Sequence, residues 1–234
     1  VARALEDDAN FDHVFFLGDG EATKDAISEL LRTEVAQVVG PDDVFIFYFA
    51  GHGIGADLDL PVLLAHDSTL ENGQEDGFEL QQFASDLTTW TPAGVGLVVT
   101  DAIHRNQLDG IYFFGPAADD WPLMPKGTMI LSSSQGEKPA TDGAMGKIFS
   151  DAVGGLADTN GDQLVTASEL FSYIEAALEP LGQRPVQSGD YDGSMVISQD
   201  VRRAPQPVVV EPDPVEVKPA VPVPPPEPVV VYPD

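Results

Sequence analysis

Residues 42–53 read Asp-Asp-Val-Phe-Ile-Phe-Tyr-Phe-Ala-Gly-His-Gly, an apolar run that ends in a histidine between two glycines. A run that is apolar on both alternating faces is typical of a parallel strand covered by helices on both sides. Ligands of open parallel sheets bind outside the carboxyl ends of the strands. We therefore expect His52 to stand at a site, where Gly51 and Gly53 leave room for a substrate carbonyl. Its imidazole suits a general base, and the alternative is a histidine that merely ends a strand.

The rest of residues 1–203 alternates short apolar runs with longer stretches of helical spacing. This alternation predicts an α/β fold with a mostly parallel central sheet and helices on both faces. The expected strands are 13–17, 43–50, 61–66, 95–100, 129–133 and 195–198. The expected helices are 23–39, 78–87, 144–156 and 166–178, the first with Thr23 as its N-cap.

Composition narrows the classes of partner. The 234 residues include 39 acidic and 11 basic side chains, which gives a formal net charge of -28. Such a charge repels phosphate backbones and anionic membranes and favours cationic partners, so we expect no nucleic-acid binding. No apolar run has the roughly 18 to 20 residues of a membrane-spanning helix. The chain has no cysteine, which excludes disulfides, thiolate metal sites and any cysteine nucleophile.

The last residues, 204–234, differ from the rest in composition. They hold 11 of the 20 prolines, alternating with valine and glutamate. This spacing favours an extended polyproline II spacer, so we expect a folded domain at 1–203, a linker at 204–234 and a further domain beyond it. The spacer is similar to those of extracytoplasmic bacterial proteins, a compositional hint at secretion that leaves the localisation open.

A second expected strand also ends in polar residues that suit a functional site. Residues 94–100 form another apolar run, followed by Asp101, Ala102, Ile103 and His104. Together the two strand ends resemble the caspase and metacaspase peptidases, especially their bacterial relatives: residues 51–53 resemble the catalytic-histidine motif, and residues 101–104 the strand that ends in Asp-x-Cys. Weaker likenesses follow in the family's order, so the resemblance covers roughly residues 1–203; they lie at 20–27, 64–67, 130–134 and 183–185.

The resemblance implies a caspase-like three-layer fold and assigns a role to each strand end. It makes His52 the base, Asp101 the acid of a pocket for Arg or Lys, and position 103 the nucleophile. Ile103 has no lone pair and forms no acyl intermediate, so the peptidase chemistry is absent by this mapping. Arg105 and Asn106 also replace the small residue and glycine of the family, which alters the loop that shapes the oxyanion site.

Other hydroxyl side chains lie near these strand ends. Thr100 precedes Asp101, and Ser132, Ser133 and Ser134 end another expected strand. Neither location is the nucleophile position of the family. We interpret them as small polar residues that end core strands.

The resemblance also leaves one strand unaccounted for. The family's fold begins with a strand before the helix that residues 1–6 resemble, and no such strand is present in this sequence. Either that strand lies upstream, which is the simpler explanation, or a valine-rich piece of the tail such as Val208–Val210 takes its place.

Residues 158–169 read Asp-Thr-Asn-Gly-Asp-Gln-Leu-Val-Thr-Ala-Ser-Glu, between two expected helices. This spacing matches the twelve-residue calcium loop of an EF-hand. The predicted calcium ligands are Asp158, Asn160, Asp162, the Leu164 carbonyl, Thr166 and Glu169. Gln163 departs from the pattern, because a glycine normally makes the sharp turn at that position. The alternative is a metal-free loop of side-chain turns in which Thr166 and Glu169 start the next helix.

Three functions remain open. The first is an inactive caspase-like domain, a pseudopeptidase stabilised by calcium, that binds a protein partner or a basic peptide segment. The second is a cysteine endopeptidase that cleaves after Arg or Lys and whose active form has cysteine at position 103. The third is a calcium-stabilised structural module of a larger surface protein.

Overall fold

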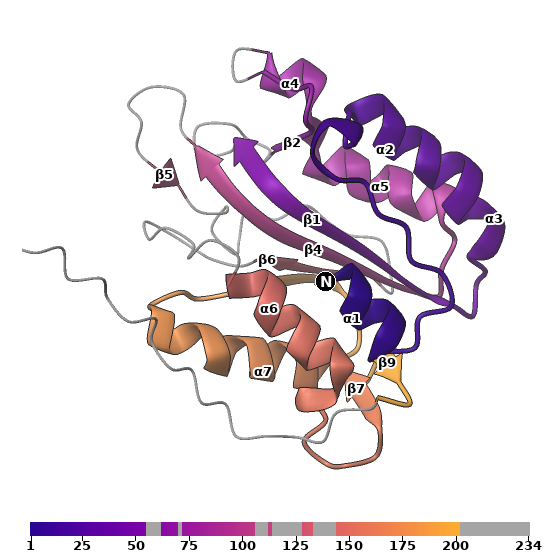
Figure 1. Ribbon diagram of the computed structural model, residues 1–234, viewed down its shortest axis with the longest axis vertical. Coiled ribbons are helices and arrows are strands. Elements are labelled where there is room, and N and C mark those ends of the chain that lie inside the picture. The colour runs from indigo at the N-terminus through magenta and orange to yellow at the C-terminus, as the bar shows by residue number, and fades with distance from the viewer. Residues whose placement is uncertain (55–61, 70–71, 106–111, 114–127, 133–143, 202–234) are drawn as a thin grey trace, which may run out of the picture.

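The computed structural model describes residues 1–54, 62–69, 72–105, 112–113, 128–132 and 144–201 (Figure 1). The strands of these residues are β1 Val44–Ile54, β2 Val62–Leu64, β3 Phe78–Glu79, β4 Val95–Arg105, β5 Tyr112–Phe113, β6 Thr128–Ser132, β7 Leu164–Thr166, β8 Val186–Asp190 and β9 Val196–Gln199. The α-helices are α1 Ala2–Asp7, α2 Lys24–Leu30, α3 Ala36–Val38, α4 Gly73–Asp76, α5 Leu80–Trp90, α6 Ala144–Asp151 and α7 Ala167–Leu178. Shorter helical turns are η1 Asp19–Glu21, η2 Leu31–Val35, η4 Ala152–Leu156 and η5 Glu179–Leu181.

The central sheet is mixed, not mostly parallel as the sequence predicts. Its strand order within the described residues is β3-β2-β1-β4-β6-β8, and β5 pairs with β4 off this path. Among the described strands, the three central ones, β1, β4 and β6, are parallel to one another. The outer strands β2, β3, β5 and β8 are each antiparallel to the strand with which they pair. The connections explain the difference: residues 55–61 and 106–111 are too few for a crossover, so β2 and β5 fold back.

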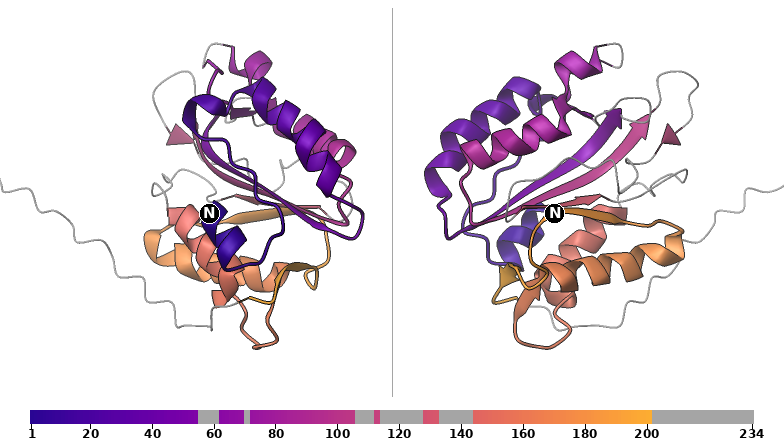
Figure 2. Two further views of the ribbon diagram at one scale, coloured as in Figure 1. Left: turned by 45° about the vertical axis from the view of Figure 1, so that its right-hand side comes forward. Right: turned by 180° about the vertical axis from the view of Figure 1, so that it is seen from behind.

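Helices cover both faces of this sheet (Figure 2). Alternation along β4 explains the layering, because Leu97 and Val99 lie in one buried cluster and Val98 in the other. The first cluster contains residues of α6 and α7, including Phe149 and Ile174. The second contains residues of α2, η2 and α5. The predicted α/β layering, with helices on both faces, is confirmed.

The expected helices are found close to their predicted bounds. The helix predicted at 23–39 is continuous through α2, η2 and α3, and the Thr23 hydroxyl accepts the Ala26 amide at 3.2 Å as its N-cap. The helix predicted at 144–156 continues from α6 into η4. At 78–87, however, Phe78 and Glu79 form β3 and the helix α5 starts only at Leu80.

One predicted strand is wrong, and another is found outside the central sheet. Residues 13–17 form no strand: within the described residues their backbone makes no hydrogen bond to a neighbouring strand, although Val14 packs on the first buried cluster and Leu17 on the second. The apolar run at 195–198 does form a strand, β9, but it pairs with β7 in a separate two-stranded sheet. The short apolar run at 164–166, which supplies β7, was too brief to stand out from the loop.

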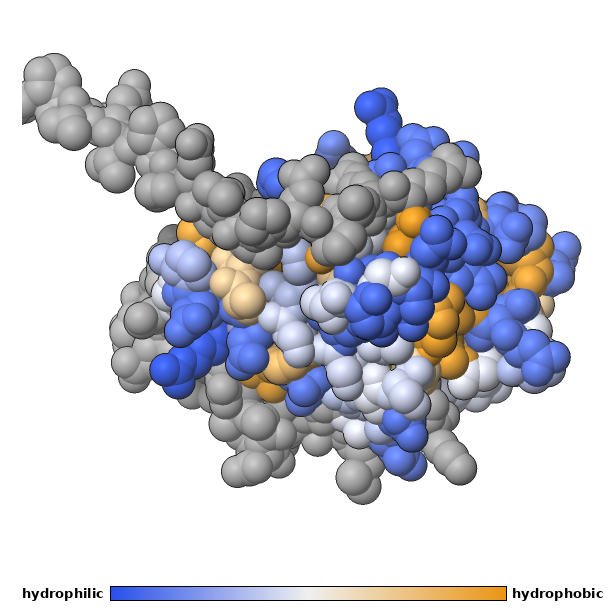
Figure 3. Space-filling view, turned by 90° about the horizontal axis from the view of Figure 1, so that it is seen from below, coloured by the Kyte–Doolittle hydropathy of each residue, from blue (hydrophilic) through white to orange (hydrophobic). Residues whose placement is uncertain are grey.

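None of the described helices is long and apolar enough to cross a membrane. The face of the molecule seen from below in Figure 3 is mainly hydrophilic, and the hydrophobic residues on it form small separate patches.

Candidate functional site

The two strand ends singled out in the sequence lie side by side. β1 and β4 are parallel and in register along their whole length, which sets Ala50 opposite Asp101 and His52 opposite Ile103. Both positions lie toward the carboxyl ends of adjacent strands, where α/β sheets bind ligands. The sheet therefore brings together the predicted base position, the predicted acid and the predicted nucleophile position.

His52 is exposed near the carboxyl end of β1. Its backbone also pairs with Leu64 of β2, so the strand holds it from both sides. Gly51 is exposed and Gly53 is buried. Among the described residues, none forms a hydrogen bond with the imidazole.

Asp101 is half-buried and joined to a tyrosine of the adjacent strand. The Tyr48 hydroxyl donates a hydrogen bond of 3.0 Å to Oδ2 of Asp101. Burial is the main cause that raises the pKa of Tyr48 above its ordinary value, and the charge and the hydrogen bond of Asp101 raise it further. The phenol therefore remains a neutral donor, and it holds the carboxylate in a defined position.

Helix α6 lies against this pair. A Cβ atom at Gly146 would be 3.3 Å from the Tyr48 hydroxyl and 4.0 Å from Oδ2 of Asp101. The absence of a side chain at Gly146 thus lets the helix approach the carboxylate closely. The ring of Tyr48 also contacts that of Phe149 one turn further along, with centroids 5.4 Å apart.

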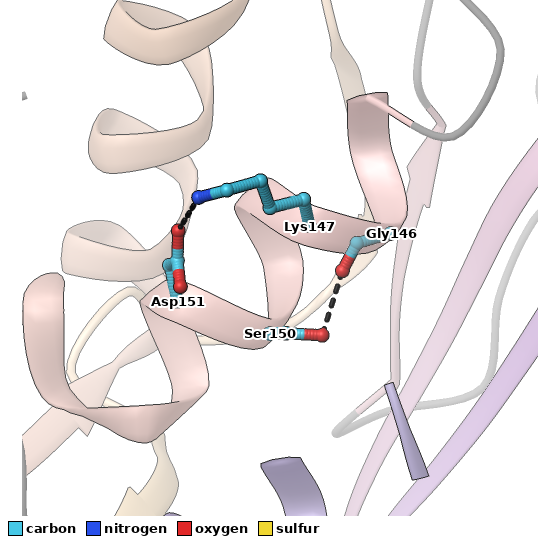
Figure 4. A network of polar contacts seen from close by, with 4 residues as sticks. All are labelled: Gly146, Lys147, Ser150 and Asp151. Atoms are coloured by element: carbon cyan, nitrogen blue, oxygen red, sulfur yellow. Dashed lines mark hydrogen bonds and ion pairs between the residues drawn. The ribbon is translucent and has the colours of Figure 1, made fainter. Parts of the chain in front are cut away.

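Lys147, the basic residue of α6, forms its ion pair within the helix and not with Asp101 (Figure 4). Nζ of Lys147 pairs with Asp151 at 2.6 Å, four residues further along the helix. The Ser150 hydroxyl donates to the Gly146 carbonyl at 2.7 Å. Lys147 is thus engaged on its own helix, and its side chain is 80% exposed.

Thr100, one of the alternative hydroxyl residues, is poorly placed for catalysis. Thr100 is 1% exposed, and its hydroxyl has no hydrogen-bond partner among the described residues. A buried hydroxyl cannot reach a substrate. The backbone of Ser132 ends β6 opposite Thr100, while Ser133, Ser134 and Asn106 lie outside the described residues.

Tyr48 and Gly146 are the residues of this site that sequence reasoning missed. The signal for Tyr48 was present, because a tyrosine in an otherwise apolar buried strand needs a partner for its hydroxyl. Gly146 gave no signal. Its role depends on the distance between a helix and a strand that are far apart in the sequence.

The acidic loop lies away from the strand ends, on the side of β7 and α7 (Figure 1). Asp158 is 3% exposed, and its two carboxylate oxygens accept the amides of Gly161 at 2.7 Å and Gln163 at 3.0 Å. Gln163 takes the left-handed φ of 67° that the turn requires. A non-glycine residue thus occupies the glycine position of the calcium pattern, at a cost of about 1 kcal/mol.

The other predicted ligands form local hydrogen bonds. Asn160 accepts the Asp162 amide at 2.8 Å, and Asp162 accepts the Leu164 amide at 2.9 Å. Thr166 and Glu169 cap α7 reciprocally, and the second oxygen of Glu169 accepts the Thr159 amide at 3.3 Å. These are the turns and the cap of the metal-free alternative.

The donor set nevertheless fits calcium chemically. It consists of carboxylate, amide, carbonyl and hydroxyl oxygens, the hard ligands that calcium takes. Within the described residues, no three acidic or histidine side chains are grouped closely enough to hold a metal ion. Glu169 would have to exchange its bonds to Thr159 and Thr166 for a bond to the ion.

The sequence matches no known family model and no curated protein.

Proposed function

We propose that this chain is a caspase-like domain that lacks peptidase activity and binds a basic peptide segment of a protein partner at the carboxyl ends of β1 and β4. The observation that carries the proposal is the strand register, in which His52 stands directly opposite Ile103. A hydrocarbon at this position supplies neither a nucleophile nor a proton, so a peptide that reaches His52 is not cleaved.

Asp101 is the group proposed to bind the basic side chain. It lies two positions before Ile103 on the same strand, and the Tyr48 hydroxyl holds Oδ2 in place. A preorganised, half-buried carboxylate forms stronger charge-assisted hydrogen bonds with a guanidinium or ammonium than a fully solvated one. The chain has 39 acidic and only 11 basic side chains, so the negative electrostatic field of the protein also attracts cations.

The proposal includes calcium at the loop of residues 158–169, in a structural role. Asp158, Asn160, Asp162, the Leu164 carbonyl, Thr166 and Glu169 would hold the ion. Bound there, calcium would link the end of η4 to the start of α7, far from the strand ends. Its role would be to stabilise the helices that support Gly146, not to take part in chemistry.

A hydrolysis assay tests the loss of catalysis. Fluorogenic peptides that end in Arg or Lys are incubated with the unaltered chain, with Ile103→Cys, and with Ile103→Cys combined with His52→Ala. We expect no turnover by the unaltered chain, cleavage by the cysteine variant, and loss of that cleavage in the double variant. Turnover by the unaltered chain would overturn the proposal and point to another nucleophile.

A binding assay tests the role of Asp101. Fluorescence anisotropy of a labelled Arg- or Lys-containing peptide is measured with Asp101→Asn, which keeps an acceptor for Tyr48 but removes the charge. We expect the Kd to rise about tenfold. Asp25→Asn is the matched control, because Asp25 is an exposed acid in the first turn of α2. Equal weakening by both variants would show diffuse attraction to the acidic surface, against a site at Asp101.

A further inference from the structure

Asparagine followed by glycine is a chemically labile pair in proteins. The chain has four asparagines, and two of them precede a glycine, in Asn72-Gly73 and Asn160-Gly161. Glycine has no Cβ atom, so its backbone nitrogen is open to the preceding side chain. The first pair lies at the start of α4 and the second in the acidic loop before β7, far apart in the molecule (Figure 1). Because the reacting residues are identical, any difference in rate arises from the structure around them.

Deamidation of such a pair is an attack within the chain. The backbone nitrogen of the glycine loses its proton to solvent and bonds to Cγ of the asparagine. The bond from Cγ to the side-chain nitrogen breaks, and that nitrogen takes up a proton from water and leaves as ammonia. Water then opens the resulting succinimide ring at either carbonyl, which gives aspartate or isoaspartate. The reaction therefore needs a glycine amide that can lose its proton and a carboxamide that can turn toward it.

Both reacting groups are held at Asn160-Gly161. The Gly161 amide donates to Oδ1 of Asp158 at 2.7 Å, and Oδ1 of Asn160 accepts the Asp162 amide at 2.8 Å. A carboxylate beside the amide opposes the loss of its proton, because the nitrogen anion would lie next to a like charge. Asp158 is 3% exposed, so water screens this repulsion poorly. The other hydrogen bond restrains the carboxamide of Asn160.

The turn around Gly161 adds to this restraint. Its φ is 77°, and the φ of Gln163 is 67°. The Gln163 amide donates to Oδ2 of Asp158 at 3.0 Å, so one buried carboxylate holds two amides of the same turn. Movement of the Gly161 nitrogen toward Cγ of Asn160 would therefore disturb the whole turn.

Asn72-Gly73 has fewer restraints. Asn72 is exposed and directly precedes α4. Its carbonyl accepts the amides of Glu75 at 2.9 Å and Asp76 at 2.8 Å, and its backbone amide donates to the Thr69 hydroxyl at 3.2 Å. These bonds leave the reacting groups unengaged: among the described residues, neither the carboxamide of Asn72 nor the Gly73 amide forms a hydrogen bond.

We propose that Asn72 is a site of spontaneous deamidation in the folded protein, and that Asp158 protects Asn160 from the same reaction. The first amide of a helix has no acceptor within that helix, so the Gly73 nitrogen is available as the attacking group. The helix α4 has only four residues, and so short a helix resists local opening weakly. The isoaspartate product would lengthen the backbone between β2 and α4 by the former side-chain carbon.

Peptide mapping by mass spectrometry measures both sites in one sample. The full chain is incubated at mildly alkaline pH with a calcium chelator, so that any protection of Asn160 comes from its hydrogen bonds and not from a bound ion. We expect Asn72 to deamidate at least about tenfold faster than Asn160. In concentrated urea the two sites should react at similar rates, because their reacting residues are the same.

Gly73→Ala tests the attack at Asn72. The added Cβ crowds the attacking nitrogen, and alanine suits the helical conformation of this residue. We expect deamidation of Asn72 to slow at least about tenfold. Gln74→Ala is the matched control, because it changes a neighbouring residue of the same helix without altering the reacting pair. It should leave the rate unchanged.

Asp158→Asn tests the protection of Asn160. The variant removes the charge and one of the two acceptor oxygens, and we expect Asn160 to deamidate at least about tenfold faster. Asp162→Asn is the matched control, because the acceptor of the Gly161 amide remains in place. Both variants are compared under conditions in which their near-UV circular dichroism matches that of the unaltered chain.

Three results would overturn the proposal. Equal rates at the two sites in the folded chain, or a faster reaction at Asn160, would show that the hydrogen bonds of the acidic loop give no protection. A rate at Asn72 that rises more than about tenfold in urea would show that the fold protects this site as well. A rate at Asn160 that stays low in folded Asp158→Asn would show that the protection does not come from Asp158.

Discussion

The acidic loop and the strand-end site differ in how far apart in the sequence their hydrogen-bonded residues lie. In the loop, the hydrogen bonds of Asp158, Asn160 and Asp162 join residues two to five positions apart. At the strand ends, the bond between Tyr48 and Asp101 joins residues 53 positions apart. The loop can therefore form once its own segment turns, whereas the strand-end site exists only after β1 and β4 have paired. Damage to the loop should therefore act on stability alone, whereas damage to the strand-end site should act on peptide binding as well.

The largest effect is expected for Asp158→Ala. The substitution leaves the amides of Gly161 and Gln163 without an acceptor beside a position that is 3% exposed. We expect the free energy of unfolding to fall by about 3 kcal/mol, measured by urea denaturation in the presence of a chelator. Asp162→Ala is the control, because the exposed Asp162 accepts only the Leu164 amide. It should cost less than about 1 kcal/mol, and equal losses would show that burial does not distinguish the two carboxylates.

A smaller effect is expected for Tyr48→Phe, which removes the donor to Asp101. We expect a loss of about 1 to 2 kcal/mol near neutral pH, because a half-buried carboxylate loses one partner. The peptide affinity should fall as well. If stability falls and affinity does not, Tyr48 supports the fold without positioning Asp101 for binding.

The same variant makes a pH prediction. Because the pKa of Tyr48 is raised in the folded protein, the phenol contributes stability that is fully present below the ordinary tyrosine pKa of about 10 and is lost as the pH rises above it. The stability of Tyr48→Phe should therefore decline less above pH 10 than that of the unaltered chain. Tyr191→Phe is the comparison, since the hydroxyl of Tyr191 bonds to the exposed Gln187. It should flatten the alkaline decline less than Tyr48→Phe does.

The smallest effect is expected for Gln163→Gly, and it is a gain. Glycine adopts the φ of 67° without strain, so we expect stability to rise by about 0.5 kcal/mol after the loss of chain entropy is subtracted. Titration with calcium chloride, followed by calorimetry, should show binding to the unaltered chain and affinity about twofold higher in the variant. Gln163→Ala should leave both quantities nearly unchanged. If neither the unaltered chain nor Gln163→Gly binds calcium, the loop is held by its own hydrogen bonds alone.

Helices and strands were predictable where the residues of a single segment, such as a cap or an apolar run, indicate the element by themselves. Thr23 is an N-cap that points to its helix, and Thr166 and Glu169 form a capping box that marks the start of α7. The strand predicted at 43–50 is found as β1, Val44–Ile54, because so apolar a run needs cover on both faces. Residues 13–17 carry a similar apolar signal but form no strand, because strand formation also requires a neighbouring strand to pair with, and the run itself does not specify one.

The candidate site was predictable only in part. Positions 52, 101 and 103 could be named because each ends a run of recognisable pattern. Tyr48 and Gly146 could not, because their roles arise from contacts across the sheet and between the sheet and α6. The strand directions on either side of the parallel centre also depended on the lengths of the connections and on the pairing of the whole sheet.

By itself the sequence determined the properties that belong to single residues or short segments: the charge, the absence of cysteine, the hydrocarbon at position 103, the caps and the turns of the acidic loop. These follow from side-chain chemistry and local backbone preference. Only the tertiary structure decided that His52 pairs in register with Ile103, that the Tyr48 hydroxyl donates to Asp101 next to Gly146, and that β1 borders a cavity. The physical reason is that burial and strand pairing join residues distant along the chain, and no local preference specifies which of them will meet.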